Sequence, residues 1–150
     1  MYIHIVKPNT EPDLRACRAC LCLASRKASR AITRAFDRRL RAHGIRSTQF
    51  SILVNLMERG PMTIGDLAEA LGIERTTLTR NLRVVEDQGW VKISVGDVDG
   101  RSRVVAATRK GRSAVAVALP SWREAQDAAA ATLGRSGFAA LQALAQTAIV

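Results

Sequence analysis

The chain has 150 residues, of which 47% are hydrophobic and 24% charged, a balance typical of a globular domain. No apolar run reaches the roughly 18 residues that a membrane span needs, and residues 1–11 lack the apolar segment of a signal peptide, so we expect no membrane association. Lys and Arg number 23 against 13 Asp and Glu, a formal net charge of +10. This excess favours polyanions such as nucleic acids, although a solvated basic surface would give the same count.

The N-terminal part predicts an arm followed by one long helix. Residues 1–13 contain Pro8 and Pro12 and predict an irregular arm. Residues 13–42 predict a helix ended by His43-Gly44, because apolar residues recur at steps of three and four. The apolar stripe consists of Leu21, Ala24, Ala28, Ile32, Ala35, Phe36 and Leu40, and the opposite, basic face of Arg26, Lys27, Arg30, Arg34, Arg38, Arg39 and Arg41.

Three shorter helices are predicted next. The first covers residues 47–58, with Ser47 or Thr48 as its N-cap, and Gly60-Pro61 ends it. The second covers residues 64–71, where Thr63 and Asp66 have the spacing of a capping box. After a tight turn at Gly72, the third covers residues 74–88 and ends at Gly89.

The C-terminal part predicts a β-hairpin and two further helices. Residues 90–95 and 103–107 have strand character and flank a polar turn. Thr108 is the expected N-cap of a helix that runs to about Leu133, with a kink at Pro120. Gly134 ends this helix, and Ser136 is the expected N-cap of the last one. The fold class is therefore mainly α with a small β-hairpin.

Residues 63–83 carry the motif most informative about function. Ala68 is small enough for two helices to cross closely, and Gly72 permits a positive φ at the turn between them. Apolar side chains fill the inner faces, whereas the outer face of the second helix carries hydroxyl and guanidinium groups, which suit DNA base edges and phosphates. A helical hairpin that only packs, or a helix lying on an anionic membrane, are the weaker alternatives. The predicted DNA-contacting residues of this helix are Arg75, Thr76, Thr77, Thr79, Arg80 and Arg83.

The hairpin adds a second predicted contact with DNA. Arg101 and Arg103 lie near its tip, and narrow minor grooves attract inserted arginine side chains. Asp99 is placed to hold Arg101 by a charge-assisted hydrogen bond. The alternative is that the tip of the hairpin is an ordinary polar turn with a local ion pair. The helical motif that precedes the hairpin makes this alternative less favoured.

These motifs together resemble the MarR family of winged helix-turn-helix regulators. The matching text runs through Leu67-Ala68, Leu71-Gly72-Ile73, Asp99-Gly100-Arg101-Ser102 and Thr108-Arg109-Lys110-Gly111, and the resemblance covers about residues 14–148. It implies a homodimer, with residues 14–46 and 108–150 as dimerisation helices and residues 47–107 as the DNA-binding lobe. It also implies a repressor that binds a pseudo-palindromic operator on double-stranded DNA and is released by a small phenolic or aromatic effector or by oxidation.

Three cysteines, Cys17, Cys20 and Cys22, are open to three interpretations. A metal site is disfavoured because Cys22 would point away from Cys20 on one continuous helix. Redox sensing is the second, since Leu21-Cys22 resembles the reactive-cysteine region of the OhrR group and Arg26 follows one turn later. Packing in the dimer interface is favoured over both. Because three closely spaced cysteines do not form a disulfide framework, a reducing cytoplasm is the expected location.

Nothing in the sequence indicates catalysis. We find no GxSxG, HExxH or phosphate-loop motif, and His4 and His43 lie outside the ordered motifs, so we expect neither an enzyme nor a bound cofactor or metal. Four aromatic residues, Phe36, Phe50, Trp90 and Trp122, are candidates for an effector pocket, although such residues are more often core. The expected function is sequence-specific transcriptional regulation; the alternative is a winged-helix adaptor that binds proteins without reading DNA.

Overall fold

A computed structural model describes residues 12–96 and 100–147. Contacts within the chain divide it into two units, residues 1–31 and residues 32–150. Residues 1–11 of the predicted arm lie outside the described residues.

In the first unit the long helix begins later than predicted. A 3-10 turn at Arg15–Ala19 precedes α1, Leu21–Leu40, and Cys20 between them has extended backbone (φ −65°, ψ 112°). Every described residue up to 31 is exposed, so no packing reinforces helix nucleation at the chain's start. Cys17 and Cys20 therefore do not share one helix with Cys22, so the prediction of one continuous helix through the three cysteines was wrong, and helical spacing does not bear on a metal site there.

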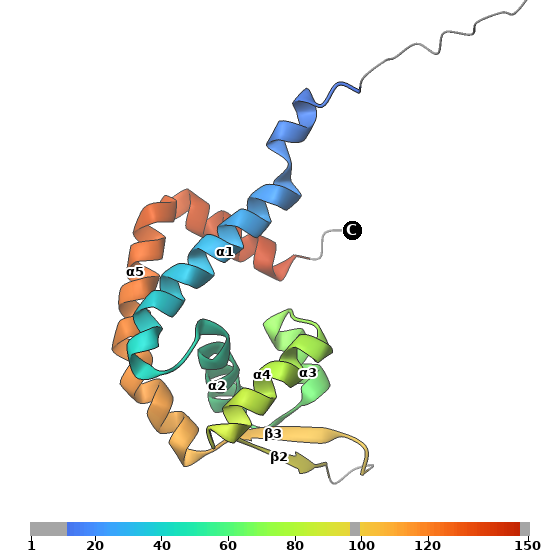
Figure 1. The fold of residues 1–150 in the computed structure, drawn as a ribbon, viewed down its shortest axis with the longest axis vertical. Helices are drawn as coiled ribbons and strands as arrows, with labels where there is room; N and C mark the ends of the chain where they lie inside the picture. Colours follow the sequence, from blue (N-terminus) through green and yellow to red (C-terminus); the bar gives the residue numbers. More distant parts are fainter. Residues whose placement is uncertain (1–11, 97–99, 148–150) are drawn as a thin grey trace, which may run out of the picture. The chain divides into compact units, whose positions relative to one another are not determined.

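The second unit contains the remaining elements, shown in Figure 1. The second half of α1 leads through a 3-10 turn, Arg41–His43, to a corner at Gly44 (φ 67°). Two helices end at glycines as predicted, α3 at Gly72 and α4 just before Gly89. The elements after the corner are α2 (Ser47–Arg59), β1 (Met62–Thr63), α3 (Ile64–Leu71), α4 (Arg75–Asp87), β2 (Val91–Val95), β3 (Arg103–Ala107) and α5 (Arg109–Gln146).

The start of α2 is capped from another helix rather than by Ser47 or Thr48. Arg46 occupies the N-cap position and its side chain makes no capping hydrogen bond. The Ser47 backbone N–H donates instead to Oδ1 of Asp37, on α1, at 2.7 Å. Gln49 Oε1 accepts from the Arg46 backbone N–H at 3.0 Å. The predicted cap was wrong because its partner lies ten residues upstream and local spacing does not reveal it.

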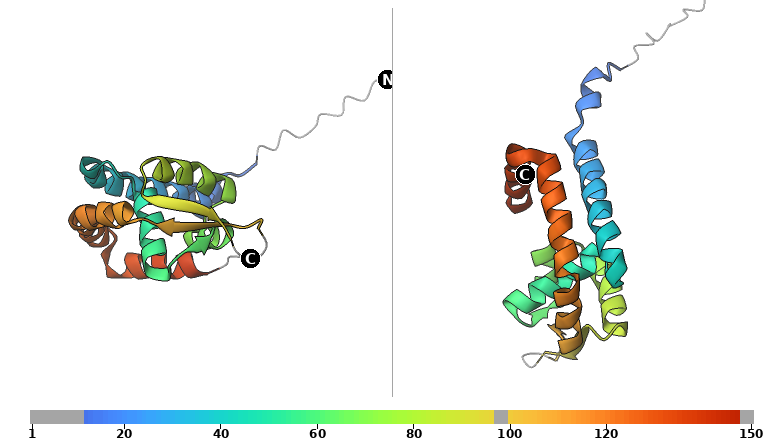
Figure 2. Two further views of the ribbon diagram at one scale, coloured as in Figure 1. Left: turned by 90° about the horizontal axis from the view of Figure 1, so that it is seen from below. Right: turned by 90° about the vertical axis from the view of Figure 1, so that its left-hand side faces the viewer.

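Three antiparallel strands form one sheet in the order β1-β3-β2. The predicted hairpin pairs Val91 with Ala107 and Val95 with Arg103 at its two ends. The sequence did not predict β1, whose two residues are too short to show alternation; Met62 lies opposite Val105 on β3. Figure 2 shows the hairpin at the end of this unit where α5 begins.

The core of the second unit lies between α2, α4, the sheet and the first half of α5. Leu53, Leu67, Leu82 and Val105 are each at most 1% exposed. Thr108 caps α5 as predicted, because its Oγ1 accepts from the Gly111 N–H at 3.1 Å and donates to the Gly89 carbonyl at 2.6 Å. This cap fixes the orientation of α5 relative to the end of α4.

The last helical segment changes direction at Gly134, as predicted. Gly134 has φ 69° and ψ 172°, the one non-helical residue within Arg109–Gln146, and helical angles continue through Pro120. Ser136 lies inside the helical segment that follows rather than before it, so the expected N-cap was misplaced. In the described ranges, no helix has the length and apolarity that crossing a membrane requires.

Candidate nucleic-acid interface

The α3–turn–α4 unit is built by local hydrogen bonds that the sequence predicted. Thr63 Oγ1 accepts from the Asp66 backbone N–H at 3.1 Å and donates to Asp66 Oδ2 at 2.8 Å, which satisfies the start of α3. Ala68, 4% exposed, allows close packing of α3 in the core. Gly72 is left-handed (φ 62°), and its N–H donates to the Glu69 carbonyl at 3.0 Å. The turn therefore fixes the direction in which α4 leaves α3.

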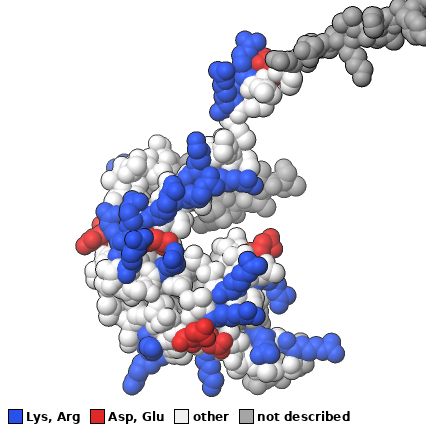
Figure 3. All heavy atoms as spheres, viewed as in Figure 1, with Lys and Arg blue, Asp and Glu red and all other residues white. Residues whose placement is uncertain are grey.

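Helix α4 has one buried face and one exposed face. Leu78, Leu82 and Val85 are at most 1% exposed and anchor the helix to the core. Figure 3 shows basic side chains gathered over α4 and the hairpin, with a few acidic side chains among them. All six residues proposed to contact DNA from this helix are exposed: Arg75, Thr76, Thr77, Thr79, Arg80 and Arg83.

The three threonines of this face are not equivalent. The Thr79 hydroxyl donates to the Arg75 carbonyl at 2.8 Å, so its proton is already used within the helix. Thr79 is therefore left as a hydrogen-bond acceptor and a methyl group, rather than the donor that the sequence suggested. Thr76 and Thr77, closer to the helix start, keep the donor capacity.

The hairpin brings Arg103 close to α4. Arg103 and Arg83 line one hollow of about 350 Å³ between α4 and the strands, together with Thr79 and Glu86. The sequence does not predict Glu86 in this hollow, because the packing of β3 against α4 is tertiary structure. Arg101 is exposed nearer the tip, and Asp99, its predicted partner, lies outside the described residues.

A second hollow, of about 370 Å³, lies between α1, α2 and α5 within the second unit. Two of the four candidate aromatics, Phe36 and Trp122, line it, with ring centroids 6.3 Å apart. Phe50 stacks on Trp122 from the core side at 5.9 Å, and Trp90 is 7% exposed and lies elsewhere. The remaining lining residues are Ile32, Thr33, Ser47, Thr48, Ser51, Leu71, Ile73 and Gln126.

The cysteines give no sign of a metal site. Cys17, Cys20 and Cys22 are all exposed. Within residues 12–96 and 100–147, no group of three or more His, Cys, Asp and Glu side chains is arranged to hold a metal ion. Cys22 lies in the first turn of α1, where its carbonyl accepts from the Ser25 hydroxyl at 2.9 Å.

A helix pair joined at a left-handed glycine and followed directly by a β-hairpin defines a winged helix-turn-helix protein. The sequence profile of the MarR family matches residues 43–102. The transcriptional regulator MosR from Mycobacterium tuberculosis, solved with DNA, is 39% identical, with a TM-score of 0.72 over 85% of this chain and 96% of its own. The chain belongs to the MarR family of transcriptional regulators, which agrees with the expectation that it is not an enzyme.

Two other proteins show how far the similarity extends. The HTH-type transcriptional regulator YwoH from Bacillus subtilis is 32% identical over 84 residues, 56% of this chain, and the match spans 61% of the length of YwoH. A cysteine-to-serine mutant of MarR from Escherichia coli, solved with operator DNA, has a TM-score of 0.76 over 90% of this chain and 97% of its own. At 20% identity, that likeness concerns the fold alone.

Proposed function

We propose that the protein is a homodimeric repressor that binds a pseudo-palindromic operator in double-stranded DNA and is released by a small ligand or by oxidation. The observation that carries the proposal is the exposed face of α4, with its arginines and threonines outward and Leu78 and Leu82 buried beneath them. A helix anchored in this way can enter a major groove without losing its core contacts.

Each part of the interface has its own role in the proposal. Arg75 and Arg80 contact base edges in the major groove, together with Thr76, Thr77 and Thr79, of which Thr79 acts as acceptor. Arg83 contacts phosphate, and Arg101, assisted by Arg103, enters or borders the minor groove. The DNA complex of MosR, at 39% identity, supports the same kind of partner for this chain.

Exposed apolar side chains on α1 and α5 support the homodimer. The predicted stripe of α1 is buried only at its end: Leu40 is fully buried, whereas Leu21 is 85% exposed. Val117, Leu141 and Leu144 on α5 are also exposed, at 64%, 42% and 56%. Apolar surface of this extent on two helices is best covered by a second copy of the chain.

Two features of the structure support the proposed release of the protein from DNA, one for a small ligand and one for oxidation. The hollow lined by Phe36 and Trp122 offers an aromatic effector two ring faces, with Ser47, Thr48 and Ser51 as polar groups to orient it. Cys22 is exposed in the first turn of α1, so a peroxide can reach its thiol. The expected location of such a regulator is the cytoplasm.

The test is selection of bound sequences from a random duplex pool, followed by titration of the selected duplex at two salt concentrations, with and without peroxide. We expect a palindromic sequence bound well above the pool. Loss of binding in peroxide that Cys22→Ser abolishes would establish oxidation as the release signal. If no duplex sequence is enriched, and binding is simply lost as the salt concentration rises, the proposal is contradicted and the adaptor function is favoured.

A further inference from the structure

The corner between α1 and α2 forms a hollow of about 530 Å³ with a strongly basic lining. Four arginines, Arg34, Arg38, Arg41 and Arg46, surround a single carboxylate, that of Asp37. None of these residues belongs to α4 or the hairpin, so the site described above does not account for them. Ile45, 2% exposed, fixes the floor of the hollow to the core.

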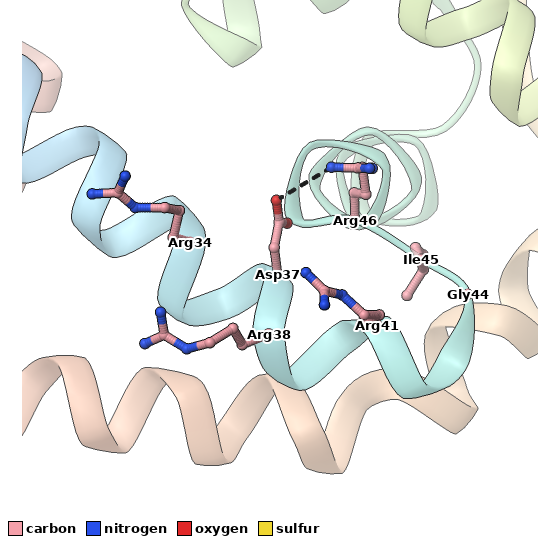
Figure 4. A pocket seen from close by; sticks show the side chains of 7 residues that line it. All are labelled: Arg34, Asp37, Arg38, Arg41, Gly44, Ile45 and Arg46. Atoms are coloured by element: carbon pink, nitrogen blue, oxygen red, sulfur yellow. Dashed lines mark ion pairs between the residues drawn. The ribbon is translucent and has the colours of Figure 1, made fainter.

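The backbone holds these arginines on facing sides of the hollow. Arg34, Arg38 and Arg41 follow one another at spacings of four and three residues, which places them on one side of α1 and the turn that ends it. Gly44, with φ 67°, then reverses the chain, and its N–H donates to the Arg41 carbonyl at 3.0 Å. Arg46 thereby faces the end of α1, and Figure 4 shows the side chains of Arg41 and Arg46 next to Asp37, whereas those of Arg34 and Arg38 lie at the outer rim and point away from it.

The carboxylate present does not neutralise this charge. Asp37 Oδ1 accepts the Ser47 backbone N–H at 2.7 Å, and Oδ2 lies 4.0 Å from Nη1 of Arg46. Within the described ranges no carboxylate lies within 4.0 Å of the guanidinium groups of Arg34, Arg38 or Arg41. The lining therefore carries a net formal charge of +3, and its like charges repel one another.

The dipole of α1 explains only part of this arrangement. Basic side chains in a last helical turn are stabilised by the helix C-terminus, which accounts for Arg38. Arg34 lies a turn earlier, and Arg46 precedes a different helix, whose positive end already has Asp37 as its acceptor. Two arginines of the hollow thus have no structural role in capping either helix.

We propose that this hollow binds a phosphate group, held by Arg41 and Arg46, with Arg38 at its rim adding positive charge. A phosphate carries up to two negative charges and three free oxygens, so it can accept charge-assisted hydrogen bonds from several guanidinium groups at once. The phosphate can come from a free phosphorylated small molecule or from the backbone of duplex DNA beyond the groove that α4 reads. This inference goes beyond the proposed function, because it holds whether or not α4 reads a specific sequence.

The experiment compares the full-length protein with the double variant Arg38→Gln/Arg41→Gln. Glutamine keeps the length of the apolar stem and removes the charge. The matched control is Arg112→Gln, since Arg112 is exposed on α5 and lines none of the three hollows described. The probe is inorganic phosphate, titrated against chloride at equal ionic strength and pH, with the melting temperature and calorimetric binding as readouts. Comparison between variants removes the general stabilisation that phosphate gives to folded proteins.

We expect phosphate to raise the melting temperature of the unmodified protein and of the control more than chloride does. The double variant should bind phosphate at least roughly tenfold more weakly, the usual effect of losing a hydrogen bond between charged groups. If all three proteins respond alike to phosphate and bind duplex DNA alike, the hollow is not a phosphate site and the proposal is overturned.

Duplex affinity, measured in chloride buffer over a range of salt concentrations, identifies the source of the phosphate. If the double variant loses the phosphate response but keeps its duplex affinity and salt slope, the ligand is a free phosphorylated molecule. If it also loses duplex affinity and its salt slope becomes shallower, the ligand is the DNA backbone. A failure of sequence selection would contradict the proposed function and leave the phosphate response unaffected.

Discussion

A single carboxylate, Asp37, joins α1 to the start of α2. Its Oδ1 accepts the Ser47 backbone N–H at 2.7 Å, and its side chain is 22% exposed. We expect Asp37→Ala to lower the free energy of unfolding by about 1–2 kcal/mol, as loss of a helix cap does. Asp37→Asn keeps an acceptor oxygen and should cost less than half as much. Urea unfolding measures both, and equal stability of Asp37→Ala and the unmodified protein would contradict the capping role.

Arg83 is predicted to contact phosphate rather than a base. It is exposed on α4 and lines the hollow shared with Arg103. Arg83→Ala should weaken binding to all duplexes alike and reduce the salt slope by about 1, because one phosphate contact releases about one counterion. Fluorescence titrations of the selected duplex and of a scrambled one over several salt concentrations provide the measurement. A change in sequence preference would instead assign Arg83 to base reading.

Arg101 tests the predicted contact of the hairpin. It is exposed near the tip. Arg101→Ala should weaken operator binding and reduce the salt slope, with the largest loss for sites whose flanks have a narrow A·T-rich minor groove. The same titrations on operators with A·T-rich and G·C-rich flanks provide the measurement, with Arg112→Ala as control. Unchanged affinity and salt slope on both operators would show that the hairpin does not contact DNA.

At the scale of elements, the packing of α5 against the end of α4 depends on Gly111. A Cβ at this position would collide with the Trp90 carbonyl oxygen and lie 3.0 Å from Leu53 Cδ2. Gly111→Ala should therefore destabilise the protein by about 1–3 kcal/mol, the range for an overpacked core. Gly137→Ala is the control, because its Cβ would make an ordinary 3.5 Å contact with Leu133 Cβ and alanine favours helix. Thermal unfolding should separate the two variants, and similar melting temperatures would mean that α5 shifts freely to accommodate the methyl group.

The elements that the sequence predicted well are those with local signals. Thr63 with Asp66, Gly72 and Gly89 mark the ends of α3 and α4, and the structure places these ends within one residue of the prediction. The features that escaped prediction depend on residues distant in sequence. The start of α2 needs Asp37 from α1, and β1 exists only because β3 lies beside it.

The same distinction separates the parts of the candidate interface. The exposed residues of α4 follow from helical periodicity alone, because Leu78 and Leu82 mark the buried side. The sequence could not show that the Thr79 hydroxyl is left only as an acceptor. A threonine hydroxyl in a helix can point to solvent or to a carbonyl of the preceding turn, and only the structure shows which. The hollow shared by Arg83 and Arg103 likewise required the position of the hairpin on α4.

At the scale of the whole molecule, the proposed dimer depends on the exposed apolar side chains of α5. Leu141 and Leu144 are 42% and 56% exposed, and a glutamate at each position would place charge in the interface. Leu141→Glu/Leu144→Glu should convert the dimer into a monomer and reduce operator affinity, because one lobe alone contacts one half-site. Sedimentation of this variant and of Val95→Glu, an equally exposed apolar site on β2, measures the effect. A monomeric unmodified protein, or a variant that stays dimeric, would contradict the role of α5.

The short strand β1 has a consequence for how the hairpin moves. An isolated pair of strands is only marginally stable in water, whereas here Met62 and Thr63 add a third strand next to β3. Thr63, which lies opposite Val104 on β3, also caps α3, so the first turn of α3 and the middle of the hairpin are joined through one residue. Amide hydrogen exchange should therefore be slow where β1 pairs with Val104 and Val105 and should be coupled to the opening of α3. The central part of the hairpin and the start of α3 are therefore expected to open together rather than independently.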